Sequence, residues 1–361
     1  MTPLTRLLRP TIARATSRAG HVRAAFALLL LSIVLAVGPG GRLIGGPSRP
    51  SSLPLVRTTL PARTTSPAPS HTSGGTALIS TDRPASRSTA NASRQPSLPM
   101  RAAFYYPWFP QAWNQQDLSP FTRYVPSLGY YDGASLALVR KHIAAMQYGH
   151  IAAGIASWWG QGSPTDQRIS TLLSAARGTT FRWALYYEVE GFSNPSVSQI
   201  RADLTYIRDR YGSDPGFLRI DGKFVMFVYA DAADRCGMAD RWRQANTVGA
   251  YVVLKVFQGY AGCASQPQGW HEYAPAVAAT SQGPYSFSIS PGFYKASESS
   301  ARLDRNLSRW MADVRQMVAS GARFQLVTSF NEWGEGTSVE SAVQWATPSG
   351  YGRYLDVLHD N

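Results

Sequence analysis

Residues 324–337 read FQLVTSFNEWGEGT, and two different patterns meet within this stretch. Its first seven residues are mostly apolar, aromatic or β-branched, which predicts a buried strand. Glu332 and Glu335 follow, and Gly334 and Gly336 permit a tight backbone path that turns both side chains inward. Two carboxylates on one strand-to-loop segment can share general acid and general base work if their surroundings separate their pKa values. The alternative is a surface turn with solvated glutamates.

From residue 100 onward, apolar β-rich runs alternate with segments of helical pattern. The alternation predicts an α/β fold with parallel strands inside and helices outside, and about 260 residues suit a (β/α)8 TIM barrel. An open doubly wound sheet would favour a glycine-rich phosphate loop after the first strand, but Tyr105-Tyr106-Pro107-Trp108 stands there. The expected strands are Ala102–Tyr106, Ile151–Trp158, Arg182–Glu188, Phe224–Tyr229, Tyr251–Phe257, Ser286–Ser290, Phe324–Phe330 and one around 273–281. The expected helices lie near 134–148, 166–177, 196–211, 237–246, 299–319 and 350–359.

Aromatic and acidic residues gather at the ends of the expected strands, where a barrel of this kind places its active site. Sugar rings stack on aromatic side chains, and their hydroxyl groups bond to carboxylates and amides. The paired glutamates and these ends together predict a glycoside hydrolase site, because glycoside hydrolysis usually needs two flanking carboxyl groups. Tyr and Trp could instead fill a core, but that does not account for the carboxylates. The candidate substrate-binding residues are Tyr106, Trp108, Trp158, Trp159, Glu188, Glu190, Tyr229, Tyr294, Asn331 and Trp333.

The segment Phe330–Thr337, followed by Val339-Glu340, resembles the signature of glycoside hydrolase family 99 and its family-99-like relatives, which include endo-α-mannosidases and endo-α-mannanases. Four other stretches agree with the family in chain order, so that the resemblance covers roughly residues 102–345. They are Phe104–Trp108, Leu128–Asp132, Gly154–Gly160 and Ser290–Tyr294.

The resemblance implies a (β/α)8 barrel and a retaining mechanism through a 1,2-anhydro sugar. By motif position, Glu332 matches the base that deprotonates the 2-hydroxyl of the substrate, and Glu335 matches the general acid/base. Asn331 and Trp333 would line the same subsite. Either Glu188 or Glu190 could be the acidic sugar ligand of the third strand, and the two share one face if that strand continues through both.

The chain departs from the family pattern at two places. Gly334 stands where the best-known mannosidases have histidine, and Glu188-Val189-Glu190-Gly191 replaces their EPY segment. The acid/base pair is retained, whereas α-mannoside specificity is left open. The expected function is therefore cleavage of an α-linked glycan. A glycan of the α-mannan type is one candidate substrate. A non-hydrolytic carbohydrate-binding or cell-surface polysaccharide assembly protein is the alternative.

The positive charge of the chain, +13 in total, is concentrated at its N-terminus. Residues 1–100 contain twelve Arg, no Lys and one acid, Asp82, whereas residues 101–361 are nearly balanced. Within residues 1–37, arginines precede the apolar run Ala24–Val37, which predicts a signal peptide or a membrane anchor. Residues 38–99, rich in Pro, Ser, Thr and Arg, predict a disordered linker before the domain at 100–361.

Both interpretations of the N-terminus place the domain outside the cell, secreted or anchored, with membrane contact only through this segment. In that compartment Cys236 and Cys263 are expected to form a disulfide, with two buried free thiols as the alternative. The six histidines show no metal-ligand spacing, so we expect neither a metal nor a cofactor. His271 is expected in a long loop without a role, and Asp221–Lys223 in the turn before the fourth strand. We also expect a monomer that binds a glycan and no nucleic acid.

Overall fold

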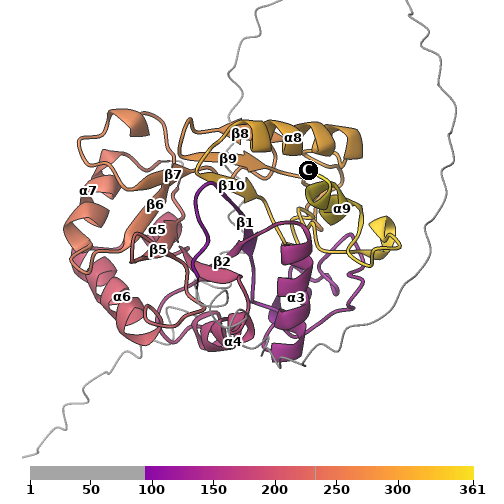
Figure 1. The fold of residues 1–361 in the computed structure, drawn as a ribbon, viewed down its shortest axis with the longest axis horizontal. Coiled ribbons are helices and arrows are strands. Elements are labelled where there is room, and N and C mark those ends of the chain that lie inside the picture. The colour runs from indigo at the N-terminus through magenta and orange to yellow at the C-terminus, as the bar shows by residue number, and fades with distance from the viewer. Residues whose placement is uncertain (1–93, 232) are drawn as a thin grey trace, which may run out of the picture.

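The structure, a computed structural model, describes residues 94–231 and 233–361 of the chain (Figure 1). The expected signal peptide or anchor, and the expected linker up to residue 93, lie outside these described residues. Their boundaries therefore stay predictions. Among the helices of the described residues, none is long and apolar enough to cross a bilayer.

A curled sheet forms the centre of the domain, and the alternation of strand and helix along the chain confirms the α/β class. Within the described residues, parallel strands follow one another in the order β7-β6-β5-β3-β2-β1-β10-β9, so that the first and last strands of the chain lie side by side. These strands are β1 (Met100–Tyr105), β2 (Ala153–Trp158), β3 (Arg182–Tyr187), β5 (Lys223–Val228), β6 (Tyr251–Lys255), β7 (Gly269–His271), β9 (Ser286–Ile289) and β10 (Phe324–Val327).

Two short strands run antiparallel to this sheet. The strand β4 (Arg219–Ile220) pairs with β5, and the turn between them is Asp221-Gly222, with φ angles of 52° and 74°. Both residues of this tight hairpin turn have positive φ, which Asp and Gly tolerate. The other antiparallel strand, β8 (Ala279–Ser281), pairs with the outer edge of β9.

Helices surround the sheet in Figure 1, and their order along the chain is the expected one. Side chains cap three of them: Ser135, Ser196 and Asn306 each accept a backbone N–H of the first turn. The helices are α3 (Leu136–Tyr148), α4 (Asp166–Ala176), α5 (Glu190–Ser193), α6 (Val197–Arg210), α7 (Cys236–Ala245), α8 (Leu307–Ala319) and α9 (Arg353–His359). Single 3-10 turns lie at η1 (Gln111–Trp113), η2 (Tyr260–Gly262) and η3 (Val343–Trp345).

The seam between β7 and β9 is where the curled sheet differs from a fully hydrogen-bonded barrel. The two strands lie close together without a backbone ladder. Instead, the hydroxyl of Ser288 donates to the Glu272 carbonyl at 2.8 Å, and that of Ser290 donates to the Pro275 carbonyl at 2.7 Å. Side chains thus replace part of the backbone pairing at this seam.

The expected strand around 273–281 and the expected position of His271 need correction. The parallel strand at this point is β7, which includes His271, and only Ala279–Ser281 of the expected range is a strand. His271 is fully buried, and its Nε2 lies 3.3 Å from the Tyr186 hydroxyl. A strand of three residues is too short to show an alternating pattern in the sequence.

A disulfide links a helix of the outer layer to a loop that follows a strand of the sheet. Cys236 at the start of α7 forms a disulfide with Cys263 in the segment after β6.

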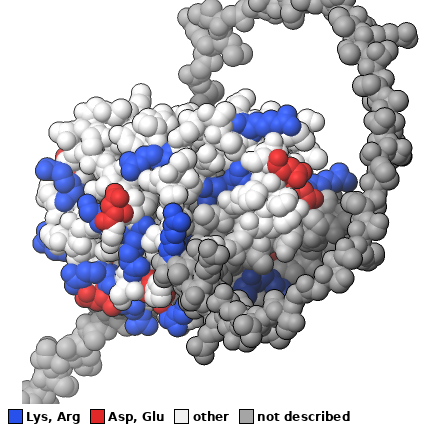
Figure 2. Space-filling model, viewed as in Figure 1, with Lys and Arg blue, Asp and Glu red and all other residues white. Residues whose placement is uncertain are grey.

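Figure 2 shows one face of the domain, on which basic side chains are spread among uncharged residues and a few acids. Basic side chains are thus more frequent than acidic ones on this face, although residues 101–361 as a whole are nearly balanced in charge.

Candidate functional site

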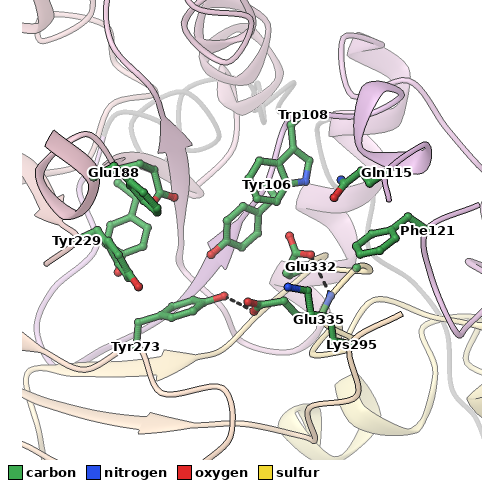
Figure 3. A pocket seen from close by; sticks show the side chains of 13 residues that line it. Tyr106, Trp108, Gln115, Phe121, Glu188, Tyr229, Tyr273, Lys295, Glu332 and Glu335 are labelled. Carbon is green, nitrogen blue, oxygen red and sulfur yellow. Dashed lines mark hydrogen bonds between the residues drawn. The ribbon is translucent and has the colours of Figure 1, made fainter. Parts of the chain in front are cut away.

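A pocket lies at the carboxyl ends of the parallel strands, with an empty volume of about 620 Å³ that includes its open mouth. Residues that follow β1, β3, β5, β7, β9 and β10 meet there, although they are far apart in the sequence (Figure 3). The lining residues are Tyr106, Trp108, Gln115, Phe121, Tyr186, Glu188, Phe192, Tyr229, Tyr273, Lys295, Glu332, Gly334 and Glu335.

The loop after β10 brings Glu332 and Glu335 to the pocket by bonding to itself. The Glu332 amide donates to the Ser329 hydroxyl at 2.8 Å, and the Glu335 amide donates to Glu332 Oε1 at 3.1 Å. Gly336 has a φ of +67°, and a Cβ there would lie 2.6 Å from the Tyr294 carbonyl oxygen. Only glycine fits this turn, which keeps both glutamates on the same side of the loop.

Each glutamate keeps one carboxylate oxygen without a partner in the described part of the chain. Glu335 Oε2 accepts a hydrogen bond from the Tyr273 hydroxyl at 2.8 Å, whereas its Oε1 has no partner. Glu332 Oε1 is held by the loop, whereas its Oε2 has none. Both residues are at most 6% exposed. Buried polar atoms normally have partners, so two free oxygens in one pocket indicate a site that receives a polar ligand.

Burial makes the carboxyl groups of the pocket weak acids. It raises the pKa of Glu335 to about 7 and that of Glu188 to about 8, because a buried charge loses its hydration. The pKa of Glu332 also lies well above its usual range, from burial first and then from the charge of Glu335. Lys295 opposes the shift of both loop glutamates. Perturbed carboxyl groups of this kind cluster at catalytic sites.

Glu188 and Glu190, which the sequence left as alternatives, have separate positions. The strand β3 ends at Tyr187 and α5 begins at Glu190, so the two glutamates do not share a strand face. Glu188 lines the pocket, and Figure 3 shows it across from Glu332 and Glu335. Glu190 is fully buried against α7, where Trp242 Nε1 donates to it at 2.7 Å and Arg241 pairs with it.

Asn331 and Trp333 support the pocket from behind and do not line it. Asn331 brackets the backbone of Tyr106: its Oδ1 accepts from the Tyr106 amide at 2.7 Å, and its Nδ2 donates to the Tyr106 carbonyl at 2.9 Å. Trp333 is fully buried and donates from Nε1 to the Tyr131 hydroxyl at 2.9 Å. That hydroxyl in turn donates to Glu340 at 2.7 Å. These bonds fix the orientation of Tyr106 and of the glutamate loop.

Three further aromatic candidates lie outside the pocket. Trp158, the last residue of β2, is fully buried and donates to Asp166 at the start of α4 at 2.7 Å, so it is a core residue. Trp159 donates to the Ser157 hydroxyl at 3.0 Å and packs against Phe192 with ring centroids 5.0 Å apart. The Tyr294 ring lies under the Arg123 guanidinium, 3.9 Å from its centroid. Strand and loop aromatics here serve packing as well as the site.

Several lining residues were not among the expected ones: Gln115, Phe121, Tyr186, Phe192, Tyr273 and Lys295. Tyr273 and Lys295 follow β7 and β9, so they obey the strand-end rule. The first of them was missed because β7 is so short, and Lys295 stands five residues beyond the predicted strand end at Ser290. Gln115 and Phe121 belong to the long segment between β1 and α3, whose path no local pattern predicts.

Gly334 is crowded by Phe121 and is not required by its own backbone angles. A Cβ at this position would lie 2.8 Å from two ring carbons of Phe121 and 3.1 Å from Glu332 Oε1. Phe121 therefore fills the space beside Glu332 that a larger residue at 334 would need. In the described residues, no group of three or more His, Cys, Asp or Glu side chains could hold a metal ion.

Comparison with known proteins gives a consistent result. The model of glycosyl hydrolase family 99 matches residues 106–249, a range that ends before Glu332 and Glu335. The glycoprotein endo-alpha-1,2-mannosidase of Mus musculus is 21% identical over 288 residues, which cover 64% of this chain and 59% of that protein. The human glycoprotein endo-alpha-1,2-mannosidase-like protein is 22% identical over 65% of this chain and 60% of its own length. The chain thus spans about three-fifths of these curated relatives.

Among solved structures, a GH99 endo-alpha-mannosidase from Bacteroides thetaiotaomicron has a similar fold. Its TM-score is 0.61, with 21% sequence identity over 73% of this chain and 96% of that chain. A structure described as a glycoside hydrolase-like protein has a TM-score of 0.55 at 16% identity. At these identities the likeness concerns the fold.

Proposed function

This chain belongs to the glycoside hydrolase family 99-like proteins, and on that premise we propose that it is a glycosidase that cleaves α-linked, mannose-containing glycans. The observation that carries the proposal is the pair Glu332 and Glu335. The two buried carboxyl groups line the same pocket, and each has one oxygen free for a ligand. Such a pair can take and give a proton on either side of one bond.

The walls of the pocket suit a sugar. The rings of Tyr106 and Trp108 stack on each other with centroids 4.6 Å apart, and those of Phe192 and Tyr229 stack at 5.8 Å. Flat apolar surfaces of this kind can pack against the apolar faces of sugar rings. Glu188 and the unpartnered Trp108 Nε1 can bond to sugar hydroxyl groups.

We propose a retaining mechanism, for which the motif resemblance supplies the roles. Glu332 takes the proton of the 2-hydroxyl, whose oxygen attacks the anomeric carbon, while Glu335 gives its proton to the leaving glycosidic oxygen. The glycosidic bond breaks and a 1,2-anhydro sugar forms. Glu335 then takes a proton from water, which opens the epoxide, and Glu332 returns the first proton to the 2-oxygen. The pKa of both glutamates is raised, by burial first, which supports a pair that still holds a proton near neutral pH.

We also propose that the enzyme works outside the cell, either secreted or anchored by its N-terminal apolar segment. The disulfide between Cys236 and Cys263 supports this, because disulfides persist in oxidising compartments. Protease treatment of intact cells, with the domain detected before and after, tests the proposal. A domain that stays protected until the cells are broken would contradict it.

The first prediction concerns the pair itself. Glu332→Gln and Glu335→Gln should each lower the hydrolysis of a susceptible glycan by about 10²–10⁴-fold, the usual contribution of a positioned acid or base. Reducing-end release from a panel of α-mannans and other α-glycans measures the rate. The control is Asp209→Asn, which removes a carboxylate from the exposed side of α6 and should leave the rate unchanged.

Two outcomes would contradict the proposal. Near-normal hydrolysis by either glutamine variant would exclude the assigned roles. Binding of a glycan by the native chain without any product would favour the alternative, a carbohydrate-binding or polysaccharide assembly protein that keeps the site architecture.

A further inference from the structure

Lys295 lies inside a pocket that contains three glutamates, and no step of the proposed reaction uses it. It lines the pocket together with Glu188, Glu332 and Glu335, and no other lining residue carries a positive charge. Its side chain is only 4% exposed. Lysine is almost never buried without a partner, because its ammonium loses hydration there. A position of this kind indicates a specific electrostatic purpose.

The backbone on both sides of Lys295 is held against the loop of the two glutamates. The Tyr294 amide donates to the Glu335 carbonyl at 2.9 Å, and the Ala296 amide donates to the Gly334 carbonyl at 2.8 Å. Arg123 Nε also donates to the Lys295 carbonyl at 3.2 Å. Lys295 is therefore fixed in register with Gly334 and Glu335, and its backbone cannot shift without moving that loop.

The side chain of Lys295 acts on the glutamates across a short gap. In Figure 3 its ammonium points toward Glu332 and Glu335. The positive charge of Lys295 lowers the pKa of both Glu332 and Glu335. Among the described residues, no group forms a hydrogen bond or an ion pair with the Lys295 Nζ. A partner at salt-bridge distance would occupy a carboxylate oxygen that a sugar needs. A cation held slightly away stabilises the negative charge and leaves these oxygens free.

The need for a cation follows from the charge of the site. An acid and a base act together only if the pair holds one proton and one negative charge. Burial favours the fully protonated pair, in which no base is left. The other charged or titratable groups that surround the pair are Tyr106, Glu188, Tyr273, Glu298 and Arg302. Of these only Arg302 is cationic, and its side chain is paired with Glu298.

We propose that Lys295 is a positioning residue that acts by charge: it keeps one negative charge on the Glu332–Glu335 pair, so that one glutamate can accept a proton while the other still carries one. The role in turnover rests on the proposed glycosidase function. The charge effect itself does not, because it belongs to the pocket without substrate. The two can therefore be tested separately.

The experiment is carboxyl-carbon NMR of the full-length chain labelled with ¹³C in its glutamate side chains. The whole chain contains only seven glutamates, so single Glu→Gln variants can assign each signal. In Lys295→Met the titrations of Glu332 and Glu335 should move to higher pH, by about one pH unit for the closer group. Lys295→Arg keeps the charge and should titrate like the native chain.

The matched control is Lys141→Met, which removes an exposed lysine of α3 and should leave all seven titrations unchanged. If Lys295→Met does not fold, the reciprocal measurement remains. With four lysines in the chain, the side-chain NMR signal of Lys295 can be followed, and its chemical shift should change in Glu335→Gln relative to the native chain. If the native chain cleaves a glycan, the acidic limb of its kcat/KM profile should shift to higher pH in Lys295→Met.

Unchanged titrations in Lys295→Met would overturn the proposal. An equal shift in Lys295→Arg and Lys295→Met would also overturn it, since the effect would then come from shape and not from charge. A shift in Lys295→Met without cleavage of any glycan by the native chain would leave Lys295 in its role and refute the glycosidase function.

Discussion

At the scale of single residues, the site depends on donors that hold one oxygen of each carboxyl group and leave the other free. Tyr273 does this for Glu335, and the amide of Glu335 does it for Glu332. Asn331 fixes the backbone of Tyr106, whose side chain lines the pocket. The local sequence shows the acids, whereas the partner of Glu335 comes from the loop after β7, 62 residues earlier in the chain.

The hydroxyl of Tyr273 lowers the pKa of Glu335, because it donates to the charged form. Tyr273→Phe should therefore raise the Glu335 titration by about one pH unit, since hydrogen bonds to charged groups contribute about 1.5–3 kcal/mol. The same NMR titration measures the shift. Tyr285→Phe, which lies just before β9 at the opposite end of the sheet, is the control and should have no effect. An unchanged Glu335 titration in Tyr273→Phe would mean that the hydrogen bond does not stabilise the carboxylate.

At the scale of elements, strands β2 and β3 pack by a size complementarity between Gly154 and Trp183. The two residues are directly paired in the sheet, and Trp183 is fully buried. A Cβ on Gly154 would lie 2.2 Å and 2.5 Å from two carbons of the indole ring. The ring is part of the rigid interior and cannot easily withdraw.

Gly154→Ala should therefore lower the free energy of unfolding by about 1–3 kcal/mol or more, the typical cost of overpacking a core. Denaturant unfolding followed by circular dichroism measures it. The matched control is Gly237→Ala in α7, where a Cβ meets no atom within 4 Å and the helix should gain slightly in stability. The double variant Gly154→Ala, Trp183→Phe should recover part of the loss; equal losses in single and double variants would point to another cause.

The strands and helices were largely predictable because most of them are long enough to show a pattern. The strands β1, β2, β3 and β10 lie within a few residues of their expected ranges, and every helix except the short α5 falls within or close to an expected range. The three residues of β7 are too few for such a pattern, so His271 and Tyr273 were misplaced or missed. Glu190 was equally unpredictable, because only the end of β3 at Tyr187 shows that it points toward α7.

At the scale of the whole molecule, the buried carboxyl groups make stability depend on pH. The pKa of Glu188 is raised to about 8 in the folded chain, above its ordinary value of 4.5. The folded state therefore holds a proton that the unfolded state loses. Stability contributed in this way is present at acidic pH and falls as the pH rises from about 4.5 to 8.

Glu188→Gln should flatten this dependence, because glutamine does not titrate. Between pH 5 and pH 8 the native chain should lose a few kcal/mol more of its free energy of unfolding than the variant does. Thermal unfolding at a series of pH values measures the difference, with Asp209→Asn on the exposed side of α6 as the control. Parallel curves for the native chain and Glu188→Gln would show that this carboxyl is ionised in the fold at neutral pH.

The class of the fold, the family resemblance and the segment that carries Glu332 and Glu335 can all be recognised from the amino-acid sequence alone. These are local properties: the period of apolar residues, and acids placed directly after a strand. The tertiary structure decided which residues join that segment. Curling of the sheet brings Glu188, Tyr273 and Lys295 to one pocket from separate strand ends, and it turns Trp158 and Glu190 away from it. Contacts across such distances depend on how the strands pair and where each one ends, which no local pattern in the chain encodes.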